Sequence, residues 1–420
     1  MTHYLFCLRH FNDIDNITPA IYFFLERREV RVTILIYSLD YPYRDDRSLN
    51  FLLDTFPERV RVAWIGDFSD YPYRVTSNAR LRLWHYRARR LAARGVPLER
   101  AITQAGGSPS LEQGIESLLA DWGGIDQAVF DQNRTPVIRG LLDVLRNCGA
   151  RRIVSLPVSP WVNINVLRQV DFIRTDAATF RKKHDYSGFD VIGQVDGYYA
   201  ESLRRFFALL GEESPFEGKV SVLGAIRYCE EWLKIREGYM PVVDSLPGSG
   251  KPKILVLPSH PKNNSFWDEY LRTLEFVSQY ERFEILVKPH TRYGAGYDKL
   301  PKNVRLVTEH DTAALIDWAD MILYWGTSVA LEGFQKGKRM VCLDYLNGNR
   351  SVFSLFGPGV MCRCKDDLMG VLLEYPQLAE ELADDKEAAE RLVNAVVFGG
   401  RGKDVPGHYL DSIEGAGHEG

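Results

Sequence analysis

The sequence lacks several features that would assign a class of protein at once. No apolar run approaches the roughly 18 residues that a membrane-spanning helix needs, and the N-terminal stretch turns polar too early for a signal peptide. The six cysteines are scattered, and only Cys362 and Cys364 stand close together, so reduced structural thiols are expected rather than a zinc site. The net charge of −4 lacks the basic excess typical of a nucleic-acid binder. A cytoplasmic globular protein is therefore expected.

The length and the pattern of apolar residues predict two domains. A chain of 420 residues exceeds what one ordinary hydrophobic core serves. Apolar β-rich runs alternate with helical patterns, which is typical of parallel βαβ units. We predict an α/β protein with two Rossmann-like, doubly wound domains, over 1–238 and 254–398, joined by a proline- and glycine-rich linker, 239–253, and followed by a segment 399–420. Such domains face a cleft, where the carboxyl ends of their strands bind ligands.

Neither predicted domain carries the Gly-x-Gly-x-x-Gly or Walker motif of classical dinucleotide and nucleoside triphosphate sites. Instead, the predicted strand 283–289 ends in Lys288, followed closely by His290 and Arg292. These three groups would not stabilise a buried strand, but they would stabilise an anion bound at its end. A solvated loop is the alternative interpretation. This strand end is therefore a candidate phosphate site.

A second strand end supports that interpretation. The predicted strand 320–326 ends in Gly326, and Thr327 and Ser328 then stand at the start of a predicted helix. Unpaired N–H groups and the helix dipole favour an anion there, although simple helix capping explains both hydroxyls as well. Glu332 lies one helical turn further. It is a candidate to accept hydrogen bonds from the ribose of a nucleotide, or else a surface glutamate.

Four segments together resemble a known family. They are "VKPHTR", "TAALIDWADMILYWGTSVALEGFQKGKRMVCLDY", "VSVLGAIRYCEEWL" and "FGGRGKDVPGHYLDSI", within about 220–413. The resemblance is to GT-B-type transferases of bacterial surface polysaccharides, and most of all to the CDP-glycerol glycerophosphotransferase and capsule-polysaccharide transferase group. It implies a GT-B fold, with an acceptor-side first domain and a second domain that binds a nucleotide-activated donor.

The departures from that family narrow the expectation. Its glycerophosphotransferases carry a His-Gly after a first-domain strand, whereas the comparable stretch here, "VSLPVSPWVNINV", has no histidine. This difference favours transfer of a sugar. The stretch "LPSHPKNN" also resembles the histidine-proline element of bacterial sialic-acid and Kdo transferases, which bind cytidine monophosphate. It adds Ser259, His260 and Asn264 to the predicted donor site and favours a cytidine-activated donor.

Charged residues after the first predicted strand, 4–8, are candidates on the acceptor side. Arg9 and His10 could grip an anionic acceptor. Asp13 and Asp15 are candidates for the general base that takes the proton from an acceptor hydroxyl. Loop solvation and helix capping also explain the two aspartates. A retaining mechanism would need a carboxylate nucleophile instead, and the sequence leaves both mechanisms open.

We therefore predict a glycosyltransferase that moves a sugar from a nucleotide-activated donor to a bacterial surface glycan, such as capsule or lipopolysaccharide, or to a lipid-linked acceptor. His290 and Arg292 are predicted to stabilise the departing phosphate, so that neither a metal ion nor a cofactor is needed. A basic segment, 80–94, is either a solvated helix or a contact with the inner face of the membrane. Transfer of a polyol phosphate from a CDP-linked donor, epimerisation of a nucleotide sugar and binding without catalysis are the alternatives.

Overall fold

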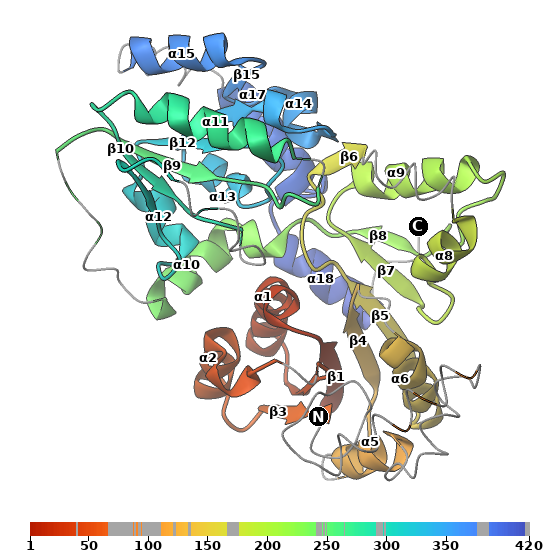
Figure 1. The fold of residues 1–420 in the computed structure, drawn as a ribbon. Helices are drawn as coiled ribbons and strands as arrows, with labels where there is room; N and C mark the ends of the chain where they lie inside the picture. Colours follow the sequence, from red (N-terminus) through yellow and green to blue (C-terminus); the bar gives the residue numbers. More distant parts are fainter. Residues whose placement is uncertain are drawn as a thin grey trace.

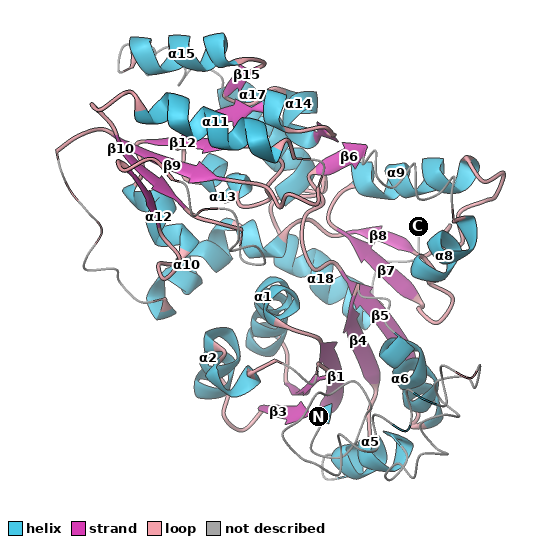
Figure 2. Cartoon of the chain, viewed as in Figure 1, coloured by secondary structure: helices cyan, strands magenta, loops and turns pink. Residues whose placement is uncertain are grey.

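The structure is a computed structural model. It describes residues 1–38, 41–65, 87, 90, 94, 111–120, 123–132, 136–165, 176–240, 246, 248, 250–263, 265–290, 297, 300–375 and 386–415. These residues form two parallel sheets with helices packed on both faces (Figures 1 and 2). The arrangement is that of two Rossmann-like domains and confirms the predicted fold class.

The first sheet has the strand order β3-β2-β1-β4-β5-β7-β8, and its strand pairs are parallel. Its strands are rich in Val, Ile and Leu, as expected for strands buried on both faces. They are β1 (Thr2–Leu8), β2 (Val30–Ile36), β3 (Val60–Trp64), β4 (Gln127–Asp131), β5 (Arg152–Leu156), β7 (Val191–Gln194) and β8 (Val220–Val222). The strand order reverses between β1 and β4, and such a switch point is where open α/β sheets bind ligands.

Helices cover both faces of the first sheet. One face packs on α1 (Phe11–Arg27), α2 (Arg47–Thr55), α10 (Glu230–Tyr239) and α18 (Val405–Glu414). The other packs on α5 (Leu111–Ala120), α6 (Pro136–Asn147), α8 (Ala177–Lys183) and α9 (Gly197–Ala208). Short 3-10 turns occupy Tyr43–Asp45 (η1) and Ile226–Tyr228 (η3).

The second sheet has the strand order β11-β10-β9-β12-β13-β15, again with parallel pairs. Its strands are β9 (Lys253–Leu257), β10 (Glu284–Val287), β11 (Val304–Leu306), β12 (Met321–Tyr324), β13 (Arg339–Leu343) and β15 (Val360–Cys362). One face packs on α11 (Trp267–Ser278) and α15 (Lys365–Glu374). The other packs on α12 (Thr312–Trp318), α13 (Ala330–Gln335), α14 (Val352–Phe356), α17 (Lys386–Leu392) and a π-helix (Val393–Val397). Asp344–Leu346 forms the 3-10 turn η4.

Two connections tie the domains together. A short antiparallel ribbon pairs β6 (Asn163–Asn165), from the first-domain part of the chain, with β14 (Arg350–Ser351), from the second. The helix α18 follows the second domain in sequence but packs in the first-domain core with Val405 and Tyr409 (Figure 1). The predicted terminal segment 399–420 thus contains a helix that completes the first domain.

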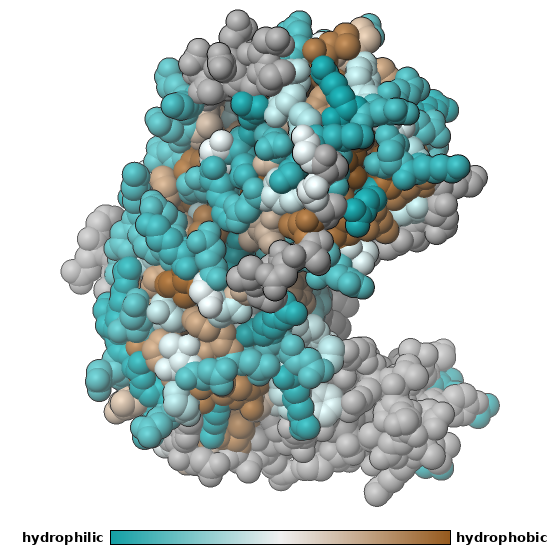
Figure 3. Space-filling model, turned by 90° about the vertical axis from the view of Figure 1, so that its left-hand side faces the viewer, coloured by the Kyte–Doolittle hydropathy of each residue, from teal (hydrophilic) through white to brown (hydrophobic). Residues whose placement is uncertain are grey.

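None of the described helices combines the length and the apolar composition that crossing a bilayer requires. Figure 3 shows one face of the molecule covered mainly by hydrophilic side chains, with hydrophobic ones in small areas between them.

Candidate functional site

Polar residues gather at the carboxyl edge of the first sheet, at its switch point. Asp131, at the end of β4, is fully buried. Its carboxylate accepts a hydrogen bond from the backbone N–H of Arg9 at 3.0 Å and one from the hydroxyl of Tyr37 at 2.7 Å. Asp131 therefore fixes the ends of β1 and β2 beside that of β4. Its carboxylate is thereby engaged in holding the edge of the sheet together.

His10 and Asp13 form a dyad at this edge. His10 directly precedes α1, and its Nδ1 lies 3.2 Å from Oδ2 of Asp13. The other ring nitrogen, Nε2, lies 2.6 Å from Nη2 of Arg9. Because a guanidinium can only donate, Nε2 accepts from Arg9 and Nδ1 carries the proton that faces Asp13. This is the tautomer in which Nε2 can take a proton.

The structure changes the roles predicted for the two aspartates. Asp13 is 1% exposed, and its carboxylate faces His10, so it cannot reach an acceptor directly. Asp15 forms an ion pair with Arg227 of η3 at 2.7 Å. Burial raises the pKa of Asp15, against the opposing effect of Arg227. The geometry thus corrects the prediction that either aspartate acts as the base, because both carboxylates are committed to protein partners.

At the carboxyl edge of the second sheet, the loop after the central strand β9 brings the predicted donor residues together. The hydroxyl of Ser259 donates to the carbonyl of Gly326 at 3.1 Å. The rings of His260 and His290 pack edge to face with centroids 5.1 Å apart. Nδ1 of His260 accepts from the backbone N–H of Lys262 at 3.0 Å, so the neutral ring carries its proton on Nε2.

The strands predicted to form this site do end at one edge of one parallel sheet. β10 and β12, however, are both neighbours of β9 rather than of each other. Two strand spacings separate their ends, about 10 Å. His260, which follows the strand between them, contacts His290 of the β10 end. The Ser259–His260 loop is therefore the centre of the predicted donor site.

Gly326 forms a tight turn among polar side chains from both domains. Its φ is +50°, in the region that favours glycine. A side chain at this position would meet the amide of Asn347 and the hydroxyl of Ser259 at 3.3 Å, and the amide oxygen of Asn163 at 3.5 Å. Asn347 also donates to Asn163 across the domain interface at 3.2 Å. The turn that leads to Thr327 is therefore fixed by contacts from both domains.

Ser328 connects the two edges. Its hydroxyl lies 3.3 Å from that of Ser159, in the loop after β5 of the first domain. The side chain of Asn12, at the start of α1, donates a hydrogen bond of 3.0 Å to the carbonyl of Val158 in the same loop. Thr327 and Ser328 are both partly exposed. The start of α1, which carries the His10–Asp13 dyad, is thus linked through one loop to the Thr327–Ser328 turn.

Lys288 has a different environment from the one predicted. Its ammonium donates to the carbonyls of Thr308 and His310, at 2.8 and 2.7 Å. Burial lowers its pKa. These bonds tie the end of β10 to the loop that precedes α12. Two of its three N–H groups are thus used within the protein, which favours a structural role for Lys288 over the predicted contact with a phosphate.

Glu332 is not a surface residue. It is 1% exposed and forms a buried ion pair with Arg236 of α10. Lys336 lies 3.7 Å from the same carboxylate. The prediction that Glu332 binds the ribose is corrected, because its carboxylate is enclosed between α10 and α13.

Some predicted residues lie outside the part of the chain that the structure describes. They are Asn264, Arg292 and most of the segment 80–94. Among the described residues, no three His, Cys, Asp or Glu side chains come together as a metal site would require. Metal independence stays a prediction.

Several residues of this site were not predicted. Ser159 and Asn163 lie in the stretch noted above only for its missing histidine, and Asn347 follows β13. Ser159 and Asn347 stand shortly after a strand, and that position is the signal that could have identified them, whereas Asn163 opens the short strand β6.

Comparisons with known proteins support the fold. No sequence model of a known family matches the chain, and no curated protein sequence does. Among solved structures, S. aureus MnaA in a co-structure with UDP is 12% identical, with a TM-score of 0.53, over 99% of this chain and 96% of that one. A UDP-N-acetylglucosamine 2-epimerase is 13% identical, with a TM-score of 0.50, over 95% and 96%. The calicheamicin glycosyltransferase CalG4 is more distant, at 16% identity and a TM-score of 0.45, over 99% and 98%.

The first two likenesses extend over nearly the whole of both chains. Together with the two parallel sheets, they define the class: the chain has the GT-B fold of two Rossmann-like domains. At 12 and 13% identity they show the fold alone.

Proposed function

We propose that the protein is a glycosyltransferase that moves a sugar from a nucleotide-activated donor to a hydroxyl of a glycan or lipid-linked acceptor. One observation carries the proposal. A histidine–aspartate dyad at the edge of the first sheet is linked, through Asn12, Val158 and Ser159, to the hydroxyl of Ser328 at the edge of the second. An acceptor and a donor bound at these edges would meet between them.

His10 supplies the base. Nε2 takes the proton from the acceptor hydroxyl as its oxygen attacks the anomeric carbon of the donor. The carboxylate of Asp13, 3.2 Å from Nδ1, holds the ring in the required tautomer and stabilises the imidazolium that forms. When it binds, the acceptor hydroxyl replaces the Arg9 guanidinium at Nε2 of His10. Arg9 is then available to bind an anionic group of the acceptor.

The residues after β9, β10 and β12 stabilise the leaving group. As the bond from the anomeric carbon to the phosphate oxygen breaks, negative charge builds up on the nucleotide phosphate. His260 has a proton on Nε2 for hydrogen bonding, and His290 lies against its ring. The hydroxyls of Thr327 and Ser328 supply further donors. Preorganised donors of this kind stabilise a developing anion without a metal ion.

The base of the nucleotide is a separate question. The "LPSHPKNN" stretch favours cytidine. The UDP in the MnaA co-structure supports uridine on the same fold. A CDP-linked polyol phosphate would use the same phosphate site. A lipid-linked acceptor would bring the protein to the inner face of a membrane as a peripheral protein.

Epimerisation of a nucleotide sugar is a second candidate, favoured by the fold shared with a UDP-N-acetylglucosamine 2-epimerase. The two activities differ in what they consume. An epimerase converts its nucleotide sugar without an acceptor, whereas a transferase releases nucleotide at full rate only when an acceptor is present. A binding module without catalysis would do neither.

A thermal-shift screen tests the donor site first. CMP, CDP, UDP and UDP-GlcNAc are each added to the purified protein with and without EDTA. We expect at least one to raise the melting temperature, to do so equally in EDTA, and to lose its effect in His260→Ala. Glu281→Gln, an exposed change remote from the β9 loop, is the control. Failure of all four nucleotides, or recovery of binding only on addition of Mg²⁺ or Mn²⁺, would contradict the proposed site.

A further inference from the structure

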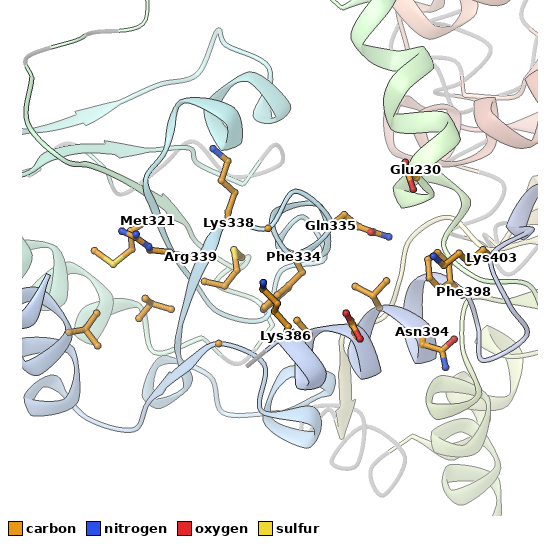
Figure 4. Close-up of a pocket in the computed structure, with 18 of the residues that line it drawn as sticks. Glu230, Met321, Phe334, Gln335, Lys338, Arg339, Lys386, Asn394, Phe398 and Lys403 are labelled. Atoms are coloured by element: carbon orange, nitrogen blue, oxygen red, sulfur yellow. The ribbon is translucent and has the colours of Figure 1, made fainter. Parts of the chain in front are cut away.

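A cavity of about 870 Å³ lies at the opposite edge of the second sheet from the candidate donor site (Figure 4). Its lining includes Met321 and Arg339, the first residues of β12 and β13. In a parallel sheet the starts of the strands share the edge opposite to their carboxyl ends. The cavity is therefore separate from the loops that hold His260, His290 and Ser328.

The cavity is built where the chain crosses between the domains. Glu230, the first residue of α10, lies on one crossing, from the first sheet to the second. Phe398 and Lys403 lie on the return crossing, between the π-helix and α18. The two crossings are hydrogen-bonded to each other, because the N–H of Ala225 donates to the carbonyl of Val397 at 2.8 Å. A ligand in the cavity would thus touch both crossings at once.

The lining combines an apolar interior with an excess of positive charge. Phe334, Met340 and Val393 are among its apolar residues. Within the described part of the lining, the cationic residues are Arg339, Lys386, Lys403 and Lys338, and the acidic ones are Glu230 and Glu390. Glu230 is already paired with Lys234, at 2.7 Å.

Not all of these charges face an occupant. The ammonium of Lys338 donates to the carbonyls of Asp317 and Ala319, at 2.8 and 3.1 Å, and Figure 4 shows its side chain turned away from Phe334 and Lys386. Arg339 lies over the ring of Tyr375. Among the lining residues that the structure describes, Lys386 and Lys403 still outnumber Glu390, so an anion is favoured.

The cavity also touches elements that lead to the donor site. The short helix α13 begins at Ala330, two residues after Ser328, and ends at Gln335 in the cavity wall. Gln335 donates to the carbonyl of Tyr228 at 3.2 Å and so contacts the first crossing. The wall opposite contains Val393 and Asn394 of the π-helix, an uncommon element that often marks functional sites.

We propose that this cavity binds an amphipathic organic anion, with its apolar body against Phe334, Met340 and Val393 and its charged group near Lys386. Its volume lies within the range of small-molecule sites, about 300–1,000 Å³. By contacting both crossings and the end of α13, the bound anion favours one arrangement of the two domains. The proposal does not rest on the proposed transfer activity, since no residue of the cleft takes part.

The test uses the full chain and the fluorescent probe 1-anilinonaphthalene-8-sulfonate, an aromatic body with a sulfonate. We expect saturable binding. Ala389→Trp, which places a large ring in the cavity from a partly exposed position of α17, and Lys386→Glu should each weaken it about tenfold, as the loss of one charged contact predicts. Arg391→Glu is the matched control, because it makes the same charge change on the same helix outside the lining. It should leave the affinity within about twofold.

Equal probe affinity in the wild type and Ala389→Trp would overturn the proposal. If circular dichroism shows that Ala389→Trp does not fold, equal effects of Lys386→Glu and Arg391→Glu would overturn it instead. Displacement distinguishes the sources of the anion. Loss of probe signal on adding dodecyl phosphate supports a lipid-like anion, and loss on adding UMP supports a nucleotide. A signal that neither compound reduces contradicts the assigned ligand class.

Discussion

The buried pair of Glu332 and Arg236 gives the sharpest test of how the two domains are joined. Glu332 lies on α13 of the second domain and is 1% exposed. Arg236 lies on α10, which packs on the first domain through Trp232, and is 4% exposed. Glu332→Gln keeps the shape of the side chain and removes its charge, so that Arg236 is left buried without its counter-ion. We expect the variant to lose stability.

The expected size of the loss follows from the burial of both partners. Removing one member of a buried ion pair costs about 3–5 kcal/mol, because the remaining charge is uncompensated. Lys336 is less affected, since Asp317 at 2.8 Å and Glu237 at 3.5 Å also pair with it. We therefore expect the free energy of unfolding to fall by about 3 kcal/mol, at the lower end of that range.

Urea unfolding of four proteins measures this loss: the wild type, Glu332→Gln, Arg236→Gln and the double variant. The double variant should be less destabilised than the sum of the two single changes, since it leaves no unpaired charge. Glu237→Gln is the control, because Glu237 lies beside Arg236 on α10 but has a side chain that is 58% exposed. This change should lower the free energy of unfolding by less than about 1 kcal/mol. An unfolding curve of Glu332→Gln that matches the wild type, with weaker nucleotide binding, would refute this reasoning and restore the ribose role.

Three further predictions follow from the site and the fold. His10→Ala should lower acceptor-dependent transfer about 10²–10⁴-fold, as expected for loss of a general base, while the nucleotide-induced thermal shift stays unchanged; a lost shift would place His10 in the donor site instead. Lys288→Met should lower the free energy of unfolding by about 1–3 kcal/mol, since the carbonyls of Thr308 and His310 lose their donor, without changing nucleotide affinity; weaker nucleotide binding would contradict this assignment. Burial raises the pKa of Asp196 to about 6. Between about pH 4 and pH 6 the folded state therefore holds a proton that the unfolded state has released. The free energy of unfolding falls by up to about 3 kcal/mol as pH rises through this range. Asp196→Asn keeps the helix cap and should remove this part of the pH dependence in urea unfolding at pH 4.5 and 8; an unchanged pH dependence would exclude Asp196 as its source.

Much of the fold could be predicted because buried parallel strands are runs of Val, Ile and Leu with turns between them. The strands predicted over 4–8, 283–289 and 320–326 correspond to β1, β10 and β12. The short strand β15, over Val360–Cys362, was not predicted. β4, over Gln127–Asp131, was also not predicted, and with it the closing Asp131 was missed. In the structure that aspartate holds the edge of the first sheet.

The functional residues were harder to predict because a sequence shows a charge without showing its partner. Ser259, His260 and His290 follow predicted strand ends, and the structure has them at the carboxyl edge of the second sheet. It did not show that Asp15 pairs with Arg227, more than two hundred residues away along the chain. Each predicted role that the structure corrects failed in this way, because folding places a protein group against a side chain for which a ligand was expected.

The position of α18 constrains the order in which the chain can fold during synthesis. Val405, Tyr409, Leu410 and Ile413 fill one face of the first-domain core, and the hydroxyl of Tyr409 bonds to the carbonyl of Gly224 at 3.0 Å. The rest of that core is complete once α10 has left the ribosome. At about 5–20 residues per second, roughly 10–30 s pass before α18 follows. During that interval the emerging first domain exposes an apolar strip beside α1, to which a chaperone could bind until the second domain has been made.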